Sequence, residues 1–233
     1  MNRDLGVTDA IRSALPDWTI PFFELAAMAG DLLVVGAVIG ILVVADVWRS
    51  RERADGTILS RRTAFVVGVI GAGLALTLIV KTVIDAPRPP AELQAVGREG
   101  NGFPSGHTMA ATVLWGALAY WSDAGTQRSR TIVAVALVAL VGLSRLALGV
   151  HYLVDVLASV AFGLAFLLAA RAFLDGDPRR SFSLAVVLGV VALVATGANA
   201  DGVVAFVGSA GAALGWWVST QPAVQRVWYA TVG

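Results

Sequence analysis

Residues 131–174 of the chain read TIVAVALVALVGLSRLALGVHYLVDVLASVAFGLAFLLAARAFL. One helix of this length would run about 66 Å at about 1.5 Å per residue, about twice the thickness of a membrane's hydrocarbon core. The segment must therefore fold back once. We expect the break where Gly142, Ser144, Arg145, Gly149 and His151 interrupt the apolar run, because polar groups in hydrocarbon need partners.

Comparable apolar runs occur along most of the chain, which has 233 residues and is 57% hydrophobic. They lie near residues 31–48, 64–84, 105–121, 131–148, 152–174, 183–199 and 203–219. A short turn at 197–202 separates the last two runs. The pattern predicts an all-α integral membrane helical bundle, with seven spans by this count and six to seven transmembrane helices as the fold class.

The N-terminal region differs from these runs. Over residues 8–29 apolar positions alternate with Asp9, Arg12 and Asp17, and Pro16 and Pro21 interrupt the segment. This pattern is typical of an amphipathic helix lying on the membrane. We therefore expect an interfacial segment at 1–30, a catalytic core at 31–174 and a C-terminal transmembrane hairpin at 175–233.

The arginines indicate how the spans are oriented. Eleven of them fall after the first, third, fifth and last spans, at Arg49, Arg51, Arg53, Arg61, Arg62, Arg128, Arg130, Arg171, Arg179, Arg180 and Arg226. The positive-inside rule assigns these loops to the cytoplasm. We expect a multi-pass protein of the cell membrane that has three polar motifs on its non-cytoplasmic face.

The motifs hold both histidines and the single lysine of the chain. They are KTVIDAPRP at 81–89, PSGH at 104–107, and SR at 144–145 followed by His151 and Asp155.

The composition of the whole chain excludes several classes of function. The net charge of +1 gives no general attraction for nucleic acid, and the absence of cysteine excludes disulfides and zinc–thiolate sites. No cleaved signal peptide is expected, because the first 20 residues lack an uninterrupted apolar core.

The motifs supply what a phosphoryl-transfer site needs. Lys81, Arg88 and Arg145 could neutralise a phosphate, with the arginine forks each gripping two oxygens. Ser105 and the backbone N–H groups around Gly106, at the start of a helix, could add neutral donors.

The two histidines fit the two ends of an in-line displacement. His151 and Asp155 are four residues apart and share a helix face, so the carboxylate can orient the ring. We therefore expect His151 to be the nucleophile and His107 the general acid and base.

Together the three motifs resemble those of the type 2 phosphatidic acid phosphatase superfamily. That family's patterns are Lys, six residues, Arg-Pro; Pro-Ser-Gly-His; and Ser-Arg, five residues, His, three residues, Asp. All three are complete here, over about 75 residues. The resemblance implies a phosphohistidine on His151, an acid/base role for His107 and no metal or other cofactor. The implied substrate is a lipid phosphate, such as a phosphatidate-like lipid or a polyprenyl (pyro)phosphate, reached from the bilayer.

The same residues allow other interpretations. Singly, Lys81 and Arg145 could be basic residues at helix ends, and His151 with Asp155 could be a structural pair or, with His107, metal ligands. The nearby cations oppose a metal. A phosphotransferase would use the same motifs, and a transporter could use the cations as an anion site. Asp31, Asp46 and Arg98 are expected to be ordinary interfacial or loop groups.

Overall fold

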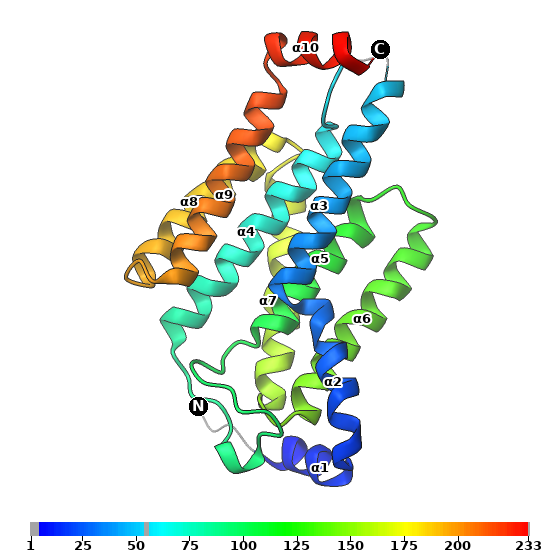
Figure 1. The fold of residues 1–233 in the computed structure, drawn as a ribbon. Helices are drawn as coiled ribbons and strands as arrows, with labels where there is room; N and C mark the ends of the chain where they lie inside the picture. The colour runs from blue at the N-terminus through cyan, green and yellow to red at the C-terminus, as the bar shows by residue number, and fades with distance from the viewer. Residues whose placement is uncertain (1–4, 54–55, 233) are drawn as a thin grey trace. The chain divides into compact units, whose positions relative to one another are not determined.

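The structure is a computed structural model that describes residues 5–53 and 56–232, and within those residues it is all-helical. It contains six helices that are long and apolar enough to cross a membrane. They are α3 (Leu32–Arg49), α4 (Arg61–Ile84), α6 (Gln127–Ala147), α7 (Leu153–Phe173), α8 (Pro178–Ala195) and α9 (Ala200–Ser219). Figure 1 shows the order of the elements along the chain. The predicted fold class, an all-α integral membrane bundle, is confirmed.

Six of the seven expected spans form helices that are long and apolar enough to cross a membrane among the described residues. The run at 105–121 forms α5 (Gly106–Trp121), which has 16 residues and is not among the six. At about 1.5 Å per residue it is about 24 Å long, less than the hydrocarbon thickness. Many of its side chains are buried, including Met109, Val113 and Leu114, so α5 is the core helix of its unit.

The expected break in 131–174 is confirmed, because α6 ends at Ala147 and α7 begins at Leu153. The expected turn near 197–202 is also present between α8 and α9, where Asn199 caps α9 by accepting a hydrogen bond from Gly202 N.

The N-terminal segment is not one helix. It forms α1 (Gly6–Ala14), the 3₁₀ turn η1 (Asp17–Thr19), α2 (Ile20–Ala27) and the 3₁₀ turn η2 (Met28–Gly30). Pro16 ends the first piece because proline disfavours helix in the residue before it, and Pro21 sits in the first turn of α2, where it is tolerated. The amphipathic character belongs to α1, and residues 1–4 of the predicted segment lie outside the described residues.

The chain divides into two compact units. Unit 1 joins Met1–Val35 with Leu76–Leu168, and unit 2 joins Gly36–Ala75 with Ala169–Gly233. The three-part division proposed from the sequence stays a prediction.

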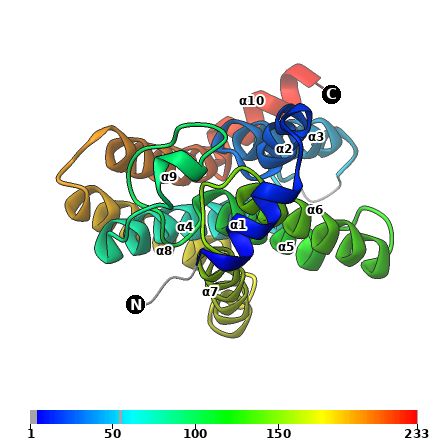
Figure 2. The same cartoon turned by 90° about the horizontal axis from the view of Figure 1, so that it is seen from below.

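In unit 1, glycines bring α5, α6 and α7 close together. A Cβ added to Gly142 of α6 would lie 2.8 Å from Val156 Cγ1, and one on Gly163 of α7 would lie 2.7 Å from Thr112 Cγ2. Small residues of this kind let membrane helices approach closely. Figure 2 views the end of this unit at which α1 and the loop 85–105, including η4 (Ala91–Leu93), lie beside one another.

In unit 2, Ala64, Val67 and Phe182 form a small apolar core, and Phe182 stacks on Trp216 with ring centroids 5.3 Å apart. The 3₁₀ turn η3 (Ser50–Glu52) follows α3. A further helix, α10 (Pro222–Val232), was not predicted from the sequence. It is held by Trp228, whose Nε1 donates to Ser50 Oγ at 3.1 Å.

Candidate active site

The turn between α6 and α7 carries His151. Gly149 has a φ of +68°, and a Cβ there would lie 2.2 Å from the Leu93 carbonyl oxygen, so only glycine fits. Ala95 N donates to the Leu148 carbonyl at 3.0 Å, which ties the turn to the loop 85–105. These contacts fix the backbone just before His151.

His151 is 1% exposed and is held from both sides of its ring. Its Nδ1 lies 3.4 Å from Asp155 Oδ2, and its Nε2 lies 3.1 Å from Arg88 Nη1. An arginine N–H can only donate, so Nε2 is the acceptor and Nδ1 carries the proton. Burial, then the charges of Arg145 and Arg88, lower the pKa of His151 to about 4, although the hydrogen bond to Asp155 opposes this. The ring is therefore neutral near pH 7, and its Nε2 lone pair accepts the hydrogen bond from Arg88.

Asp155 is fully buried and its Oδ2 also accepts a hydrogen bond from Tyr152 N at 2.9 Å. Two donors thus point at the carboxylate, the Tyr152 amide and the His151 ring. This arrangement fixes the ring orientation that the spacing of the third motif predicted.

Arg145 is the most unusual side chain of the unit. It is 1% exposed, yet its Nε and Nη1 atoms have no hydrogen-bond partner among the residues that the structure describes. Burying a charged group whose donors lack partners costs roughly several kcal/mol of folding free energy. Buried donors left without acceptors at such a cost are suited to an anionic ligand.

Arg88 reaches the same place from the loop 85–105. Its Nη1 donates to the Val150 carbonyl at 3.1 Å and its Nε to the Glu99 carbonyl at 3.1 Å. Burial, followed by repulsion from Arg98, lowers the pKa of Arg88 from its ordinary value. The loop folds tightly here: a Cβ on Gly102 would lie 2.6 Å from the Pro87 carbonyl oxygen.

Lys81 lies near the N-terminus of α5. Its Nζ is 3.9 Å from the position that a Cβ on Gly106 would take, and Asn101 Nδ2 donates to the Lys81 carbonyl at 3.2 Å. The glycine therefore leaves room for the ammonium beside the first turn of the helix, where an anion is favoured.

Ser105 is the N-cap of α5. Its Oγ accepts from Thr108 N at 3.4 Å and lies 2.9 Å from Thr108 Oγ1. Ser159 Oγ lies within 3.0 Å of the Ser105 carbonyl oxygen and 2.6 Å of the Asp155 carbonyl oxygen, which ties α5 to α7. The hydroxyl of Ser105 is thus engaged in the cap, while its predicted role as a phosphate donor stays a prediction.

His107 lies one residue further along α5 and is less buried than His151. Its Nε2 is 3.6 Å from Asp31 Oδ2, and its side chain is 28% exposed. Arg145, His151 and Lys81 all act on it electrostatically, so it shares their surroundings. All eight predicted site residues therefore lie in unit 1, and direct contacts connect Arg88, His151 and Asp155.

Two charged residues near this group were assigned ordinary roles by sequence reasoning. Asp31 faces His107, and Arg98 acts on Arg88 and His107. Neither belongs to a motif, although Asp31 directly precedes an apolar run, a typical helix-cap position. Asp46, in contrast, is the structural group expected, paired with Arg53 at 2.9 Å.

No group of three or more His, Cys, Asp or Glu side chains suited to a metal is found among the described residues. The donors gathered here are mainly cationic, which suits an anion better than a metal ion. The chemistry available to them is to bind a phosphate between cations, with a neutral imidazole as nucleophile.

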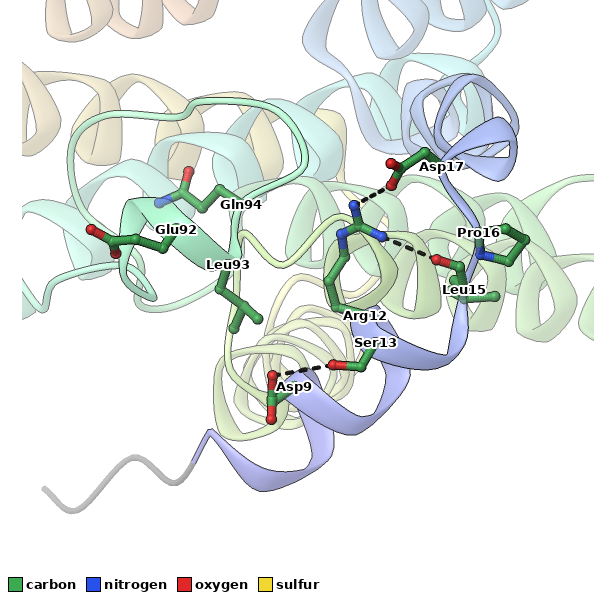
Figure 3. Close-up of a pocket in the computed structure, with 9 residues that line it drawn as sticks. All are labelled: Asp9, Arg12, Ser13, Leu15, Pro16, Asp17, Glu92, Leu93 and Gln94. Carbon is green, nitrogen blue, oxygen red and sulfur yellow. Dashed lines mark hydrogen bonds and ion pairs between the residues drawn. The ribbon is translucent and has the colours of Figure 1, made fainter.

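A separate pocket of about 530 Å³ opens between α1 and η4 (Figure 3). Three of its lining residues are acidic, Asp9, Asp17 and Glu92, and its Arg12 is paired with Asp17 at 2.7 Å. None of the predicted site residues lines it. An acidic pocket with a neutralised arginine is a poor place for a phosphate, so Arg145 stays the predicted phosphate-binding residue.

Comparisons with known proteins show what the chain is similar to. The chain is 27% identical over 139 residues to phosphatidylglycerophosphatase B of Bacillus subtilis, an alignment that covers 57% of this chain and 64% of that protein, just under two thirds of its length. Among solved structures, the transmembrane PAP2 type phosphatidylglycerolphosphate phosphatase from Bacillus subtilis has a TM-score of 0.62 at 24% identity, covering 73% of this chain and 83% of that one.

The Aquifex aeolicus LpxE structure has a TM-score of 0.57 at 21% identity, covering 73% of this chain and 95% of that one. These two similarities show a shared fold. The sequence model of the PAP2 superfamily matches residues 62–179, about half of the chain, and this range includes all three motifs. On this evidence the chain belongs to the PAP2 superfamily.

Proposed function

We propose that this protein is a metal-independent membrane phosphatase that hydrolyses phosphate esters of lipids through a phosphohistidine on His151. The observation that carries the proposal is Arg145, a fully buried cation with two unpartnered donors, in the same unit as a neutral, oriented imidazole. A phosphate would supply the missing acceptors.

The first step forms the bond between His151 Nε2 and phosphorus while the bond from phosphorus to the lipid oxygen breaks. His107 gives its proton to the departing alkoxide. Arg88, Arg145 and Lys81 hold the equatorial oxygens, where the transition state concentrates negative charge. Because Arg88 already contacts Nε2 at 3.1 Å, a phosphate bound by this arginine is placed beside the nucleophile.

In the second step a water oxygen forms a bond to phosphorus as the bond to Nε2 breaks. His107, now neutral, takes the proton from that water, and inorganic phosphate leaves. The acid of the first step is thus the base of the second.

We propose a glycerophospholipid phosphate as substrate, with phosphatidylglycerophosphate as the first candidate. The support is the similarity to a curated protein and to a solved structure, both from Bacillus subtilis, whose names state that activity. The experiment is phosphate release by purified protein from phosphatidylglycerophosphate, phosphatidate and a polyprenyl pyrophosphate. Release from one or more supports a phosphatase, and binding without release would indicate a transporter. Transfer to an added alcohol instead of water would indicate a phosphotransferase.

We propose further that the site faces away from the cytoplasm in the cell membrane, as the arginine distribution predicts. The chain has no cysteine, so single cysteines give a clean test. Glu92→Cys, in the loop 85–105, should react with a membrane-impermeant maleimide in intact cells, whereas Arg128→Cys should react only after permeabilisation. The reverse labelling pattern would overturn this orientation.

A further inference from the structure

The two carboxylate oxygens of Asp31 have different partners. Oδ1 accepts a hydrogen bond from Leu33 N at 2.8 Å and so caps the start of α3, while Oδ2 lies 3.6 Å from His107 Nε2. A cap needs only one oxygen. The second oxygen is therefore available to the imidazole.

Backbone packing holds Asp31 in this position. A Cβ added to Gly30 would lie 2.1 Å from the His107 carbonyl oxygen, so the η2 turn is in direct contact with the backbone of α5. Trp115 Nε1 also donates to the Ala29 carbonyl at 2.8 Å. These two packing contacts of the η2 turn with α5 place the Asp31 carboxylate beside His107, independently of any charge attraction between the two side chains.

The other charged groups around His107 are cations or can become so. They are Lys81 from α4, Arg98 from the loop 85–105, Arg145 from α6 and His151 from the turn before α7. All of them oppose a positive charge on the ring. A general acid must nevertheless carry a proton when the lipid oxygen departs, and Asp31 is a carboxylate 3.6 Å from this ring, close enough to form an ion pair once the ring is protonated.

We propose that Asp31 is a positioning residue that holds the Nε2–H of His107 and favours the protonated form of the His107 ring. With Nε2 held by the carboxylate, Nδ1 of His107 exchanges protons with the substrate. This inference rests on the proposed function. The proton on Nδ1 passes to the alkoxide as the phosphorus–oxygen bond breaks. Nδ1 later accepts a proton from the attacking water as the bond from phosphorus to His151 Nε2 breaks.

The arrangement parallels that of His151, whose Nδ1 faces Asp155 Oδ2 at 3.4 Å. Each imidazole has one nitrogen beside a carboxylate, and the nitrogens are of opposite kinds. In each ring the other nitrogen is the one that points away from the carboxylate: Nδ1 of His107, and Nε2 of His151, which contacts Arg88.

The test is Asp31→Asn, which keeps an oxygen to cap α3, because asparagine and aspartate are similar N-caps. We expect kcat to fall by about tenfold or more, a part of the roughly 10²- to 10⁴-fold that general acid–base catalysis supplies. KM should stay within about twofold, and the alkaline limb of the pH–kcat profile should move to lower pH. Asp31→Glu, which restores the carboxylate, should recover part of the rate and the original limb.

The matched control is Asp177→Asn. Asp177 caps α8 by accepting from Arg179 N at 3.0 Å and faces Arg61 at 3.7 Å, so it is also a capping carboxylate beside a cation. This variant should keep the wild-type kcat and pH profile. In a His107→Ala background, Asp31→Asn should lower kcat no further, because its effect is exerted through the ring.

Asp31 also acts electrostatically on Arg145. If Asp31→Asn changed activity by weakening the binding of phosphate at Arg145, the change would appear in KM. A raised KM with unchanged kcat would overturn the inference, as would an unshifted pH profile in an active Asp31→Asn enzyme. If the wild-type protein released no phosphate from any lipid phosphate, the proposed function would fail and this inference with it.

Discussion

Arg88 Nη1 lies 3.1 Å from His151 Nε2, on the side of the ring away from Asp155. Since arginine only donates, this contact assigns the lone pair to Nε2 and the proton to Nδ1. A cation predicted to hold phosphate thus touches the atom predicted to attack it.

The unpartnered donors of Arg145 predict that replacing this residue lowers activity without lowering the thermal stability of the protein. Arg145→Met removes a buried charge with two donors, Nε and Nη1, that have no hydrogen-bond partner among the described residues, so the Tm in detergent should stay the same or rise. Activity should be lost, and stabilisation by added phosphate should disappear. The control is Arg53→Met, which breaks the partly buried ion pair with Asp46 and should lower the Tm. A marked fall in Tm for Arg145→Met would show that its role is structural.

The lowered pKa of His151, about 4, predicts a histidine that stays neutral through the physiological range. An unperturbed histidine has a pKa of about 6.5. Because the pKa of His151 is lowered, its ring binds the second proton only in more acidic solution than an ordinary histidine. With only two histidines in the chain, NMR of ring-labelled histidine gives two signals, and His107→Ala assigns them. Titration of the His151 signal at pH 6.5 or above would contradict the burial argument.

The turn before His151 should not tolerate a side chain at Gly149. Gly149→Ala and Gly176→Ala place alanine at φ values of +68° and +66°, a left-handed conformation that costs about 1–2 kcal/mol. Only the alanine at Gly149 also meets the Leu93 carbonyl oxygen, at 2.2 Å, whereas nothing lies within 4 Å at Gly176. Gly149→Ala should therefore lose more stability and most activity, as thermal melts and phosphate release would show. Equal effects of the two substitutions would count against this packing.

The helices and the motif residues could be predicted because their signals are local. Apolar runs gave the long helices, and the Gly149–His151 interruption gave the break between α6 and α7. What the sequence left hidden depends on tertiary packing. Asp31 contacts His107 only because η2 packs against α5, and the residues around Asp31 in the sequence do not indicate that its partner is this histidine.

Two further differences have the same origin. The run at 105–121 looked like a span because hydropathy does not distinguish a lipid-facing helix from a buried one, yet α5 is short and largely buried. The helix α10 was missed because its contacts to Ser50 come from a distant part of the chain, through Trp228 and Tyr229. Its local signal was Pro222, a common first residue of a helix.

A site built from cations predicts specific responses to inhibitors. Vanadate should inhibit, because it takes the five-coordinate geometry of phosphorus during transfer and carries the charge that Arg145 and Arg88 bind. EDTA should leave the rate unchanged, since no metal takes part in the proposed steps. Inhibition by EDTA that one divalent ion reverses would contradict the mechanism.

The central claim is that His151 carries the phosphoryl group, and rapid-quench labelling measures this directly. With an aryl phosphate labelled at phosphorus, whose leaving group needs no proton, His107→Ala should accumulate an acid-labile, base-stable phosphate that peptide mapping places on His151. His151→Ala should show neither turnover nor labelled protein. Full activity in His151→Ala, or a phosphate on any other residue, would contradict the account.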